Sequence, residues 1–213
     1  MNLITQRFMR IFFKLLYHPF AFTYDLIAAA VSFGHWKDWV MTVLPFIEGK
    51  RILELGHGPG HLQRALLNLK IDSVAIDESA QMGTLTKRRL GSINKLTRGL
   101  AQHLPFRNNS FDTVVATFPT NYIFRVDTLS EIRRCLSDGG RLIVLPAAFP
   151  NSRFLKWLYK VTGESPAQLD ESIKSKFKQP FINAGFETET QIIEVKSSNL
   201  LIVIAHKIGK EEI

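Results

Sequence analysis

The chain has 213 residues, enough for one well-buried core with an accessory element and short for two independent domains. Hydrophobic residues make up 46% and charged residues 22%, a balance that excludes wholesale disorder. The formal net charge of +8 is compatible with nucleic acid, anionic lipid or an acidic substrate and carries no information about the fold. The single cysteine, Cys135, excludes an internal disulfide and a cysteine zinc cluster. No metal is therefore expected, and a reducing cytoplasm is the favoured location.

Residues 1–48 are expected to form an N-terminal helical cap, with a first helix that stops at Pro19. Basic residues recur at helical spacing along that helix, opposite an apolar side. The basic stripe is compatible with peripheral contact to an anionic membrane, although a solvated helix face is the favoured interpretation. The most apolar stretch, residues 11–33, is interrupted by Lys14, His18 and Asp25. Neither a transmembrane segment nor a secretory signal is therefore expected.

Residues 49–213 are expected to form one α/β domain, because strand patterns alternate with helix patterns along this part of the chain. The strands are predicted at residues 51–55, 73–76, 97–101, 111–117 and 141–145, and the helices at 61–69, 80–90, 128–136 and across 152–182. A closing hairpin is predicted from residues 187–195 and 200–206. The pattern indicates a Rossmann-like, doubly wound sheet, mostly parallel, with an antiparallel C-terminal hairpin strand behind the helical cap.

A glycine-rich turn between the first strand and the next helix is the strongest functional signal. Gly56, Gly58 and Gly60 permit a tight turn and a close backbone approach to a ligand, and the helix N-terminus suits an anionic group. Asp77 ends the second strand roughly 20 residues later, where a nucleotide-binding fold places a carboxylate for ribose hydroxyls. Glu54 precedes the glycines, where dinucleotide enzymes usually have an apolar residue.

Three ordered blocks carry a family resemblance. They are Ile52–His61 with the pattern (Glu/Asp)-x-Gly-x-Gly-x-Gly, Gly99–Phe106 followed by Asn109–Val115, and Glu131–Leu136 followed by Gly139–Val144. Over residues 49–147 the chain resembles the class I S-adenosylmethionine (SAM) dependent methyltransferases, in the quinone-biosynthesis or methyltransferase type 11 branch.

The resemblance implies SAM as the cofactor and assigns residues to its parts. The glycines and His57 would cradle the methionine part, which Glu54 orients, and Asp77 with Glu78 would hold the ribose. Ala101 and Gln102 would flank the adenine, and Thr117 and Phe118 would line the sulfonium side. Leu100 replaces an acid that many relatives carry, so the adenine amino group is expected to bond Gln102 or a backbone carbonyl.

The expected reaction is methyl transfer to a small-molecule or lipid-like acceptor. The sulfonium already activates the methyl group, so placement supplies most of the gain and no catalytic residue is identified. Tyr24 in the cap and Tyr122 after the fourth strand are candidate substrate contacts, with core packing as the alternative for Tyr24. For His57, His61 and His103, loop filling is favoured over a general base.

Three other functions stay open. A nucleic-acid (RNA) methyltransferase fits the charge, but Thr117-Phe118-Pro119-Thr120 lacks the (Asp/Asn)-Pro-Pro-(Tyr/Phe) pattern of base-amino methyltransferases, and Cys135 lies on the next helix rather than in that loop. A nicotinamide oxidoreductase shares the fold but not the acid at Glu54. A non-catalytic SAM-binding partner protein would keep the same glycines and Asp77.

Overall fold

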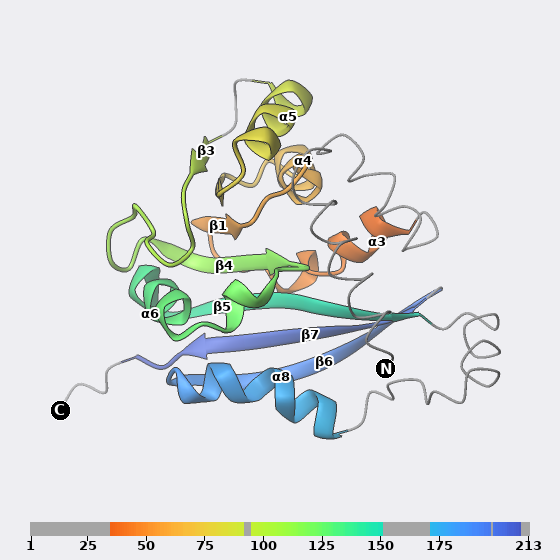
Figure 1. Ribbon diagram of the computed structural model, residues 1–213, viewed down its shortest axis with the longest axis vertical. Helices are drawn as coiled ribbons and strands as arrows, with labels where there is room; N and C mark the ends of the chain where they lie inside the picture. Colours follow the sequence, from red (N-terminus) through yellow and green to blue (C-terminus); the bar gives the residue numbers. More distant parts are fainter. Residues whose placement is uncertain (1–34, 92–94, 151–170, 197, 210–213) are drawn as a thin grey trace, which may run out of the picture.

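The computed structural model describes residues 35–91, 95–150, 171–196 and 198–209 (Figure 1). Tyr24, the basic stripe and most of the predicted cap lie outside the described residues, as does the first part of the helical region predicted across 152–182.

A seven-stranded sheet of order β3-β2-β1-β4-β5-β7-β6 runs through the described residues (Figure 1). Its strands are β1 (Ile52–Leu55), β2 (Ser73–Asp77), β3 (Lys95–Arg98), β4 (Phe111–Thr117), β5 (Leu136–Pro150), β6 (Phe186–Val195) and β7 (Ser198–Lys207). Strands β1 to β5 pair in parallel, and β7 is antiparallel to both β5 and β6. The predicted fold class, with its antiparallel terminal strand, is confirmed.

The helices lie on both faces of this sheet. They are α3 (Trp36–Met41), α4 (His61–Asn68), α5 (Ala80–Leu90), α6 (Val126–Cys135) and α8 (Glu171–Asn183), with short 3-10 turns η2 (Leu44–Phe46) and η3 (Asn121–Phe124). Among the described residues, no helix is long and apolar enough to cross a membrane.

Two hydrophobic clusters show which side chains face which layer. Alternate residues of each central strand point to opposite faces, as the strand period of two requires. Leu53, Val114 and Leu142 pack with α6 and α8, whereas Ile52, Val115 and Ile143 pack with α3 and α4. The buried residues of α3, Trp39 and Val40, belong to the second cluster. The described end of the predicted cap therefore shares its core with the sheet.

Several predicted boundaries are wrong. The third strand covers Lys95–Arg98 rather than 97–101, because its pairing with β2 ends at the Asp77–Arg98 pair. The fifth strand covers Leu136–Pro150, since it pairs with β4 from Leu136 and continues along β7 past Leu145. In the hairpin, Ser198 and Asn199 belong to β7 instead of the loop.

The strand order reverses between β1 and β4, because the chain moves outward in one direction through β2 and β3 and in the other through β5. The carboxyl ends of β1, β2 and β4 therefore meet at the point where open α/β sheets place their ligands.

Candidate cofactor and acceptor cleft

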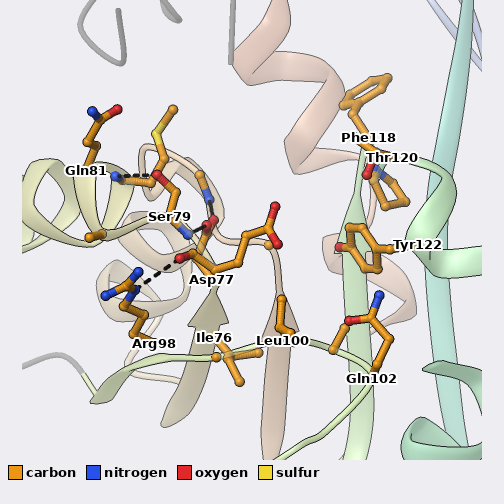
Figure 2. A pocket seen from close by; sticks show the side chains of 18 of the residues that line it. Ile76, Asp77, Ser79, Gln81, Arg98, Leu100, Gln102, Phe118, Thr120 and Tyr122 are labelled. Carbon is orange, nitrogen blue, oxygen red and sulfur yellow. Dashed lines mark hydrogen bonds between the residues drawn. The ribbon is translucent and has the colours of Figure 1, made fainter. Parts of the chain in front are cut away.

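A cavity of 1160 Å³ opens at the carboxyl ends of β1, β2 and β4. Figure 2 shows Asp77, Ser79 and Arg98 on one side, Phe118, Thr120 and Tyr122 on the other, with Ile76 and Leu100 below and between them. The cavity exceeds the roughly 300–1,000 Å³ of ordinary ligand pockets. It is therefore large enough for a ligand of nucleotide size.

The Asp77 carboxylate lies directly against the glycine turn. The backbone N–H of Gly58 donates to Asp77 Oδ2 at 2.9 Å, and that of Ser79 donates to Oδ1 at 2.8 Å. A carboxylate oxygen can accept two hydrogen bonds, so both oxygens keep capacity for hydroxyl groups in the cavity. Ser79 then caps α5 by accepting from the Met82 N–H at 3.2 Å. The turn, the acid and the next helix start are therefore held as one unit.

At two positions of the turn, both the backbone torsion angle φ and the lack of room for a side chain favour glycine. At Gly56, φ is +68° and an added Cβ would lie 2.8 Å from Tyr122 Oη. At Gly60, φ is +80° and an added Cβ would lie 2.6 Å from the side chain of Thr86. The left-handed region strains other residues, and backbone or packing would have to shift at both sites.

The segment after β3 supplies the lower wall of the cavity. The Gly99 N–H donates to the Asp77 carbonyl at 3.1 Å, and the His103 N–H donates to the Leu100 carbonyl at 3.1 Å. Between these bonds, Leu100, Ala101 and Gln102 line the cavity, and Leu100 is 46% exposed. An exposed apolar side chain at this place offers a surface for a flat nucleobase.

Phe118, directly after β4, forms the opposite wall together with Thr117, Pro119, Thr120 and Tyr122. Its φ of +47° is unusual for a residue that is not glycine. The Phe118 N–H donates to the Leu145 carbonyl at 2.7 Å, and its ring centre lies 4.3 Å from that of Trp36. The ring is therefore held at the cavity edge from two sides, and Trp36 packs against it.

Glu54, His57 and Gly60, which the resemblance placed against the cofactor, lie behind the wall that the described residues form. Glu54 shares the strand face of Ile52 and turns toward α4, where Gln63 Nε2 donates to its carboxylate at 2.8 Å. Gln63 Oε1 accepts from Ser73 Oγ at 3.0 Å. Burial, as the largest cause, raises the pKa of Glu54 to about 8, and the nearby Asp77 charge adds to this effect. Glu54 is thus a member of a buried polar chain beneath the turn.

The histidines of the predicted loops differ in their surroundings. His57 is buried, and its Nδ1 lies 2.8 Å from the Gly58 carbonyl and 3.4 Å from Thr86 Oγ1. His61 opens α4, and His103 is exposed in the turn after Gln102. His57 therefore packs inside the loop. Among the described residues, no group of His, Cys, Asp or Glu side chains is arranged to hold a metal ion.

Sequence reasoning missed three contributors to this region: Ser79, Arg98 and Gln63. Ser79 and Arg98 line the cavity, and Arg98 Nε donates to the Glu78 carbonyl at 3.1 Å. A serine directly before the first residue of a helix is a capping signal that would have found Ser79. The position of Arg98 depends on strand pairing, and that of Gln63 on helix packing, so neither carries a local signal.

Residues 53–144 match a family model described as a methyltransferase domain. A demethylmenaquinone methyltransferase of Lactiplantibacillus plantarum is 30% identical over 165 residues, which cover 71% of this chain and 70% of that protein. The chain belongs to the class I SAM-dependent methyltransferases, in the methyltransferase type 11 branch. The family's cofactor is SAM, and the predicted family is confirmed.

Other similar proteins agree with this membership. A ubiquinone/menaquinone biosynthesis C-methyltransferase of Blochmanniella floridana is 31% identical over 156 residues, or 68% of this chain. The chain spans 61% of the length of that relative. A SAM-dependent methyltransferase structure from Thermotoga maritima has a TM-score of 0.59 at 20% identity, covering 90% of this chain and 99% of that one. At this identity the likeness establishes the fold.

Proposed function

We propose that this methyltransferase transfers the methyl group of SAM to a small, largely apolar acceptor, a quinone-like ring or another lipid-like molecule. The observation that carries the proposal is the shape of the cleft. One half has the glycine turn, Asp77 and the Leu100–Gln102 segment, and the other half is walled by Phe118, Pro119 and Tyr122. A nucleotide on the first half would leave the aromatic half for the acceptor.

In the proposed complex, SAM lies with its ribose hydroxyls on Asp77 and Glu78 and its base against Leu100, Ala101 and Gln102. The methionine part follows the turn at Gly56 and Gly58, and the methyl group points toward Thr117 and Phe118. Glu54, His57 and Gly60 act one layer behind, by holding the turn in shape. The bound sulfonium supplies the activated methyl group, and the protein aligns the acceptor with it.

Two observations favour an apolar acceptor over nucleic acid. Phe118 and Tyr122 present aromatic surface at the cavity, where a ring or an isoprenoid-like chain gains by leaving water. The relatives from Blochmanniella floridana and Lactiplantibacillus plantarum are named for quinone biosynthesis. A reduced quinone ring is electron-rich at carbon, so a carbon acceptor needs a general base only for the departing ring proton.

The test is transfer of labelled methyl from SAM by the full chain to three acceptor classes: a reduced demethylated quinone, a polar amine, and bulk RNA. We expect label in the quinone alone. Phe118→Leu should raise the acceptor KM several-fold and change the affinity for S-adenosylhomocysteine (SAH) far less, because SAH lacks the methyl group that points toward Phe118. Phe124→Leu is the matched control, because Phe124 packs against Phe177 and Phe181 under α8. Label in RNA, or SAH binding without transfer to any acceptor, would refute the proposal.

A further inference from the structure

The connection between β3 and β4 shapes one wall of the cleft although residues 99–110 form neither helix nor strand. Its first part carries three cavity-lining residues, Leu100, Ala101 and Gln102. Backbone groups in such a segment need partners from elsewhere to hold a fixed path. For Leu104, Phe106, Asn109 and Ser110, these partners come from one helix, α6.

Glu131 and Arg134 of α6 form a two-residue clamp on this segment. The Arg134 guanidinium donates to Glu131 Oε1 at 2.7 Å through Nε and to Oε2 at 2.8 Å through Nη2. The same guanidinium donates to the carbonyls of Leu104 at 3.0 Å and Phe106 at 2.7 Å. Glu131 Oε2 in turn accepts from the Leu104 N–H at 2.8 Å. Both backbone groups of Leu104 are thus satisfied by the clamp.

The clamp extends to the end of the connection. Arg134 Nη1 also donates to Asn108 Oδ1 at 2.9 Å. The Asn109 N–H donates to the Arg134 carbonyl at 3.0 Å, and the Ser110 N–H to the Cys135 carbonyl at 2.8 Å. These two carbonyls belong to the last turn of α6, which lacks partners within the helix. The end of the segment and the last turn of α6 therefore satisfy each other's backbone hydrogen-bonding groups.

We infer that Glu131 and Arg134 are positioning residues for the nucleobase side of the cleft. The inference rests on the proposed function, because it takes the Leu100–Gln102 wall to be the place of the adenine. That wall is held at one end by the Gly99 bond to β2 and at the other by Leu104 in the clamp. Only four residues separate these two anchors, so the position of Leu104 fixes the path of the wall.

Loss of the clamp should weaken the binding contacts of the adenine base and leave those of the rest of the cofactor intact. Asp77 and the glycine turn are held by their own bonds to Gly58 and Ser79, which involve no residue of α6. Without the clamp, the Leu100–Gln102 wall would have to become ordered when the ligand binds. Ordering a loop costs free energy, so the affinity for SAH would be lower than with a wall that is already in place. The adenine contacts weaken, whereas the contacts of the ribose and the amino-acid tail remain.

The experiment compares SAH with S-ribosylhomocysteine, which is SAH without its base, in competition binding to the full chain. Arg134→Gln should weaken SAH about tenfold, the scale of one lost charged hydrogen bond. It should change S-ribosylhomocysteine by less than twofold. Glu131→Gln keeps an acceptor for the Leu104 N–H and should weaken SAH less. Arg125→Gln is the control, because Arg125 lies just before α6 and its guanidinium pairs with the exposed Asp127.

Amide hydrogen exchange keeps the test decisive if Arg134→Gln folds poorly. In Arg134→Lys, the His103 and Leu104 amides should exchange faster than in the wild-type chain, while those of β2 and β4 remain protected. Equal losses for both ligands, or an SAH affinity within twofold of wild type in every clamp variant, would overturn the inference. A wild-type chain that binds neither ligand would refute the proposed function itself, before any variant is compared.

Discussion

Glu54 lies in an environment that is unusual for a glutamate, because it is buried. It is 1% exposed, and its carboxylate faces Gln63 on α4. A buried carboxyl group is costly in its charged form, and burial accordingly raises its pKa from 4.5 to about 8. At neutral pH the group is therefore protonated in the folded chain and ionised in the unfolded chain.

This difference in protonation predicts how stability depends on pH. Between about pH 4.5 and pH 8 the unfolded chain binds fewer protons than the folded one, so the free energy of unfolding falls as pH rises. The contribution of Glu54 approaches roughly 1.4 kcal/mol per pH unit. Glu54→Gln keeps an oxygen acceptor for Gln63 and should remove this slope, giving a chain more stable than wild type at pH 8.

Urea denaturation of the two chains from pH 5 to pH 9 measures the effect. Glu48→Gln serves as the control, because Glu48 is an exposed glutamate paired with Arg141. It should retain the wild-type slope. Parallel pH profiles of wild type and Glu54→Gln would show that Glu54 is ionised in the folded chain.

The position of Asp77 could be predicted from the sequence, whereas the direction of the Glu54 side chain could not. The glycine spacing and Asp77 follow from backbone torsion angles and strand length, which are local properties, and the structure brings them together. The direction of Glu54 is different, because all four residues of β1 are buried and the strand has no polar face. Nothing local shows which face α4 covers.

Among the elements, β1 enters the sheet through a tie to β4. Asp112 accepts from the backbone N–H groups of Lys50 and Arg51 at 3.0 and 3.1 Å and forms an ion pair with the Arg51 guanidinium. Arg51, as the largest cause, holds the pKa of Asp112 well below its usual value of 3.8. Gly49 adjoins Asp112 so closely that an added Cβ would overlap it. Asp112, which lies within β4, therefore ties the start of β1 to that strand.

Asp112→Asn should lower the free energy of unfolding at pH 7 by about 1–2 kcal/mol, a modest value because the pair is partly exposed. A lowered folded pKa stabilises the fold above pH 3.8, and this stabilisation disappears as pH falls through the acid range. The difference in stability between the two chains should therefore be smaller at pH 3 than at pH 7. Thermal unfolding from pH 3 to pH 7 checks this, with Asp138→Asn, an exposed partner of Lys207, as the control. A constant difference down to pH 3 would contradict it.

The central elements were predictable and the peripheral ones less so. The bounds of β4 and α5 match the prediction, because an apolar run and a serine-capped helix are defined by their own residues. The edge strand β3 has exposed ends and little apolar content, so its limits depend on pairing with β2. The length of β5 depends on its pairing with β7, which begins only at Ser198. The hydrogen bonds from Arg134 to the Leu104 and Phe106 carbonyls likewise depend on how the connection between β3 and β4 packs against α6.

At the scale of the whole molecule, the alternation of strands and helices was sufficient to predict a doubly wound sheet, and the reversal of strand order then fixes where ligands bind. The two halves of the cleft come from strands on opposite sides of the point where the strand order reverses. The half proposed for the nucleotide is built from β1, β2 and the segment after β3, and the aromatic half from the segment after β4. The point where the strand order reverses thus brings together the surfaces proposed for the cofactor and for the acceptor.

We propose that Asp77 and the glycine turn together bind a SAM-type ligand. Calorimetric titration of the full chain with SAH tests it most directly, in wild type, in Asp77→Asn and in the control Asp72→Asn, whose exposed carboxylate pairs with Lys95. We predict micromolar-range binding, no heat with NAD, and a loss of about 1–3 kcal/mol in Asp77→Asn alone. Heat with NAD but not with SAH, or an unchanged SAH affinity in Asp77→Asn, would contradict the account.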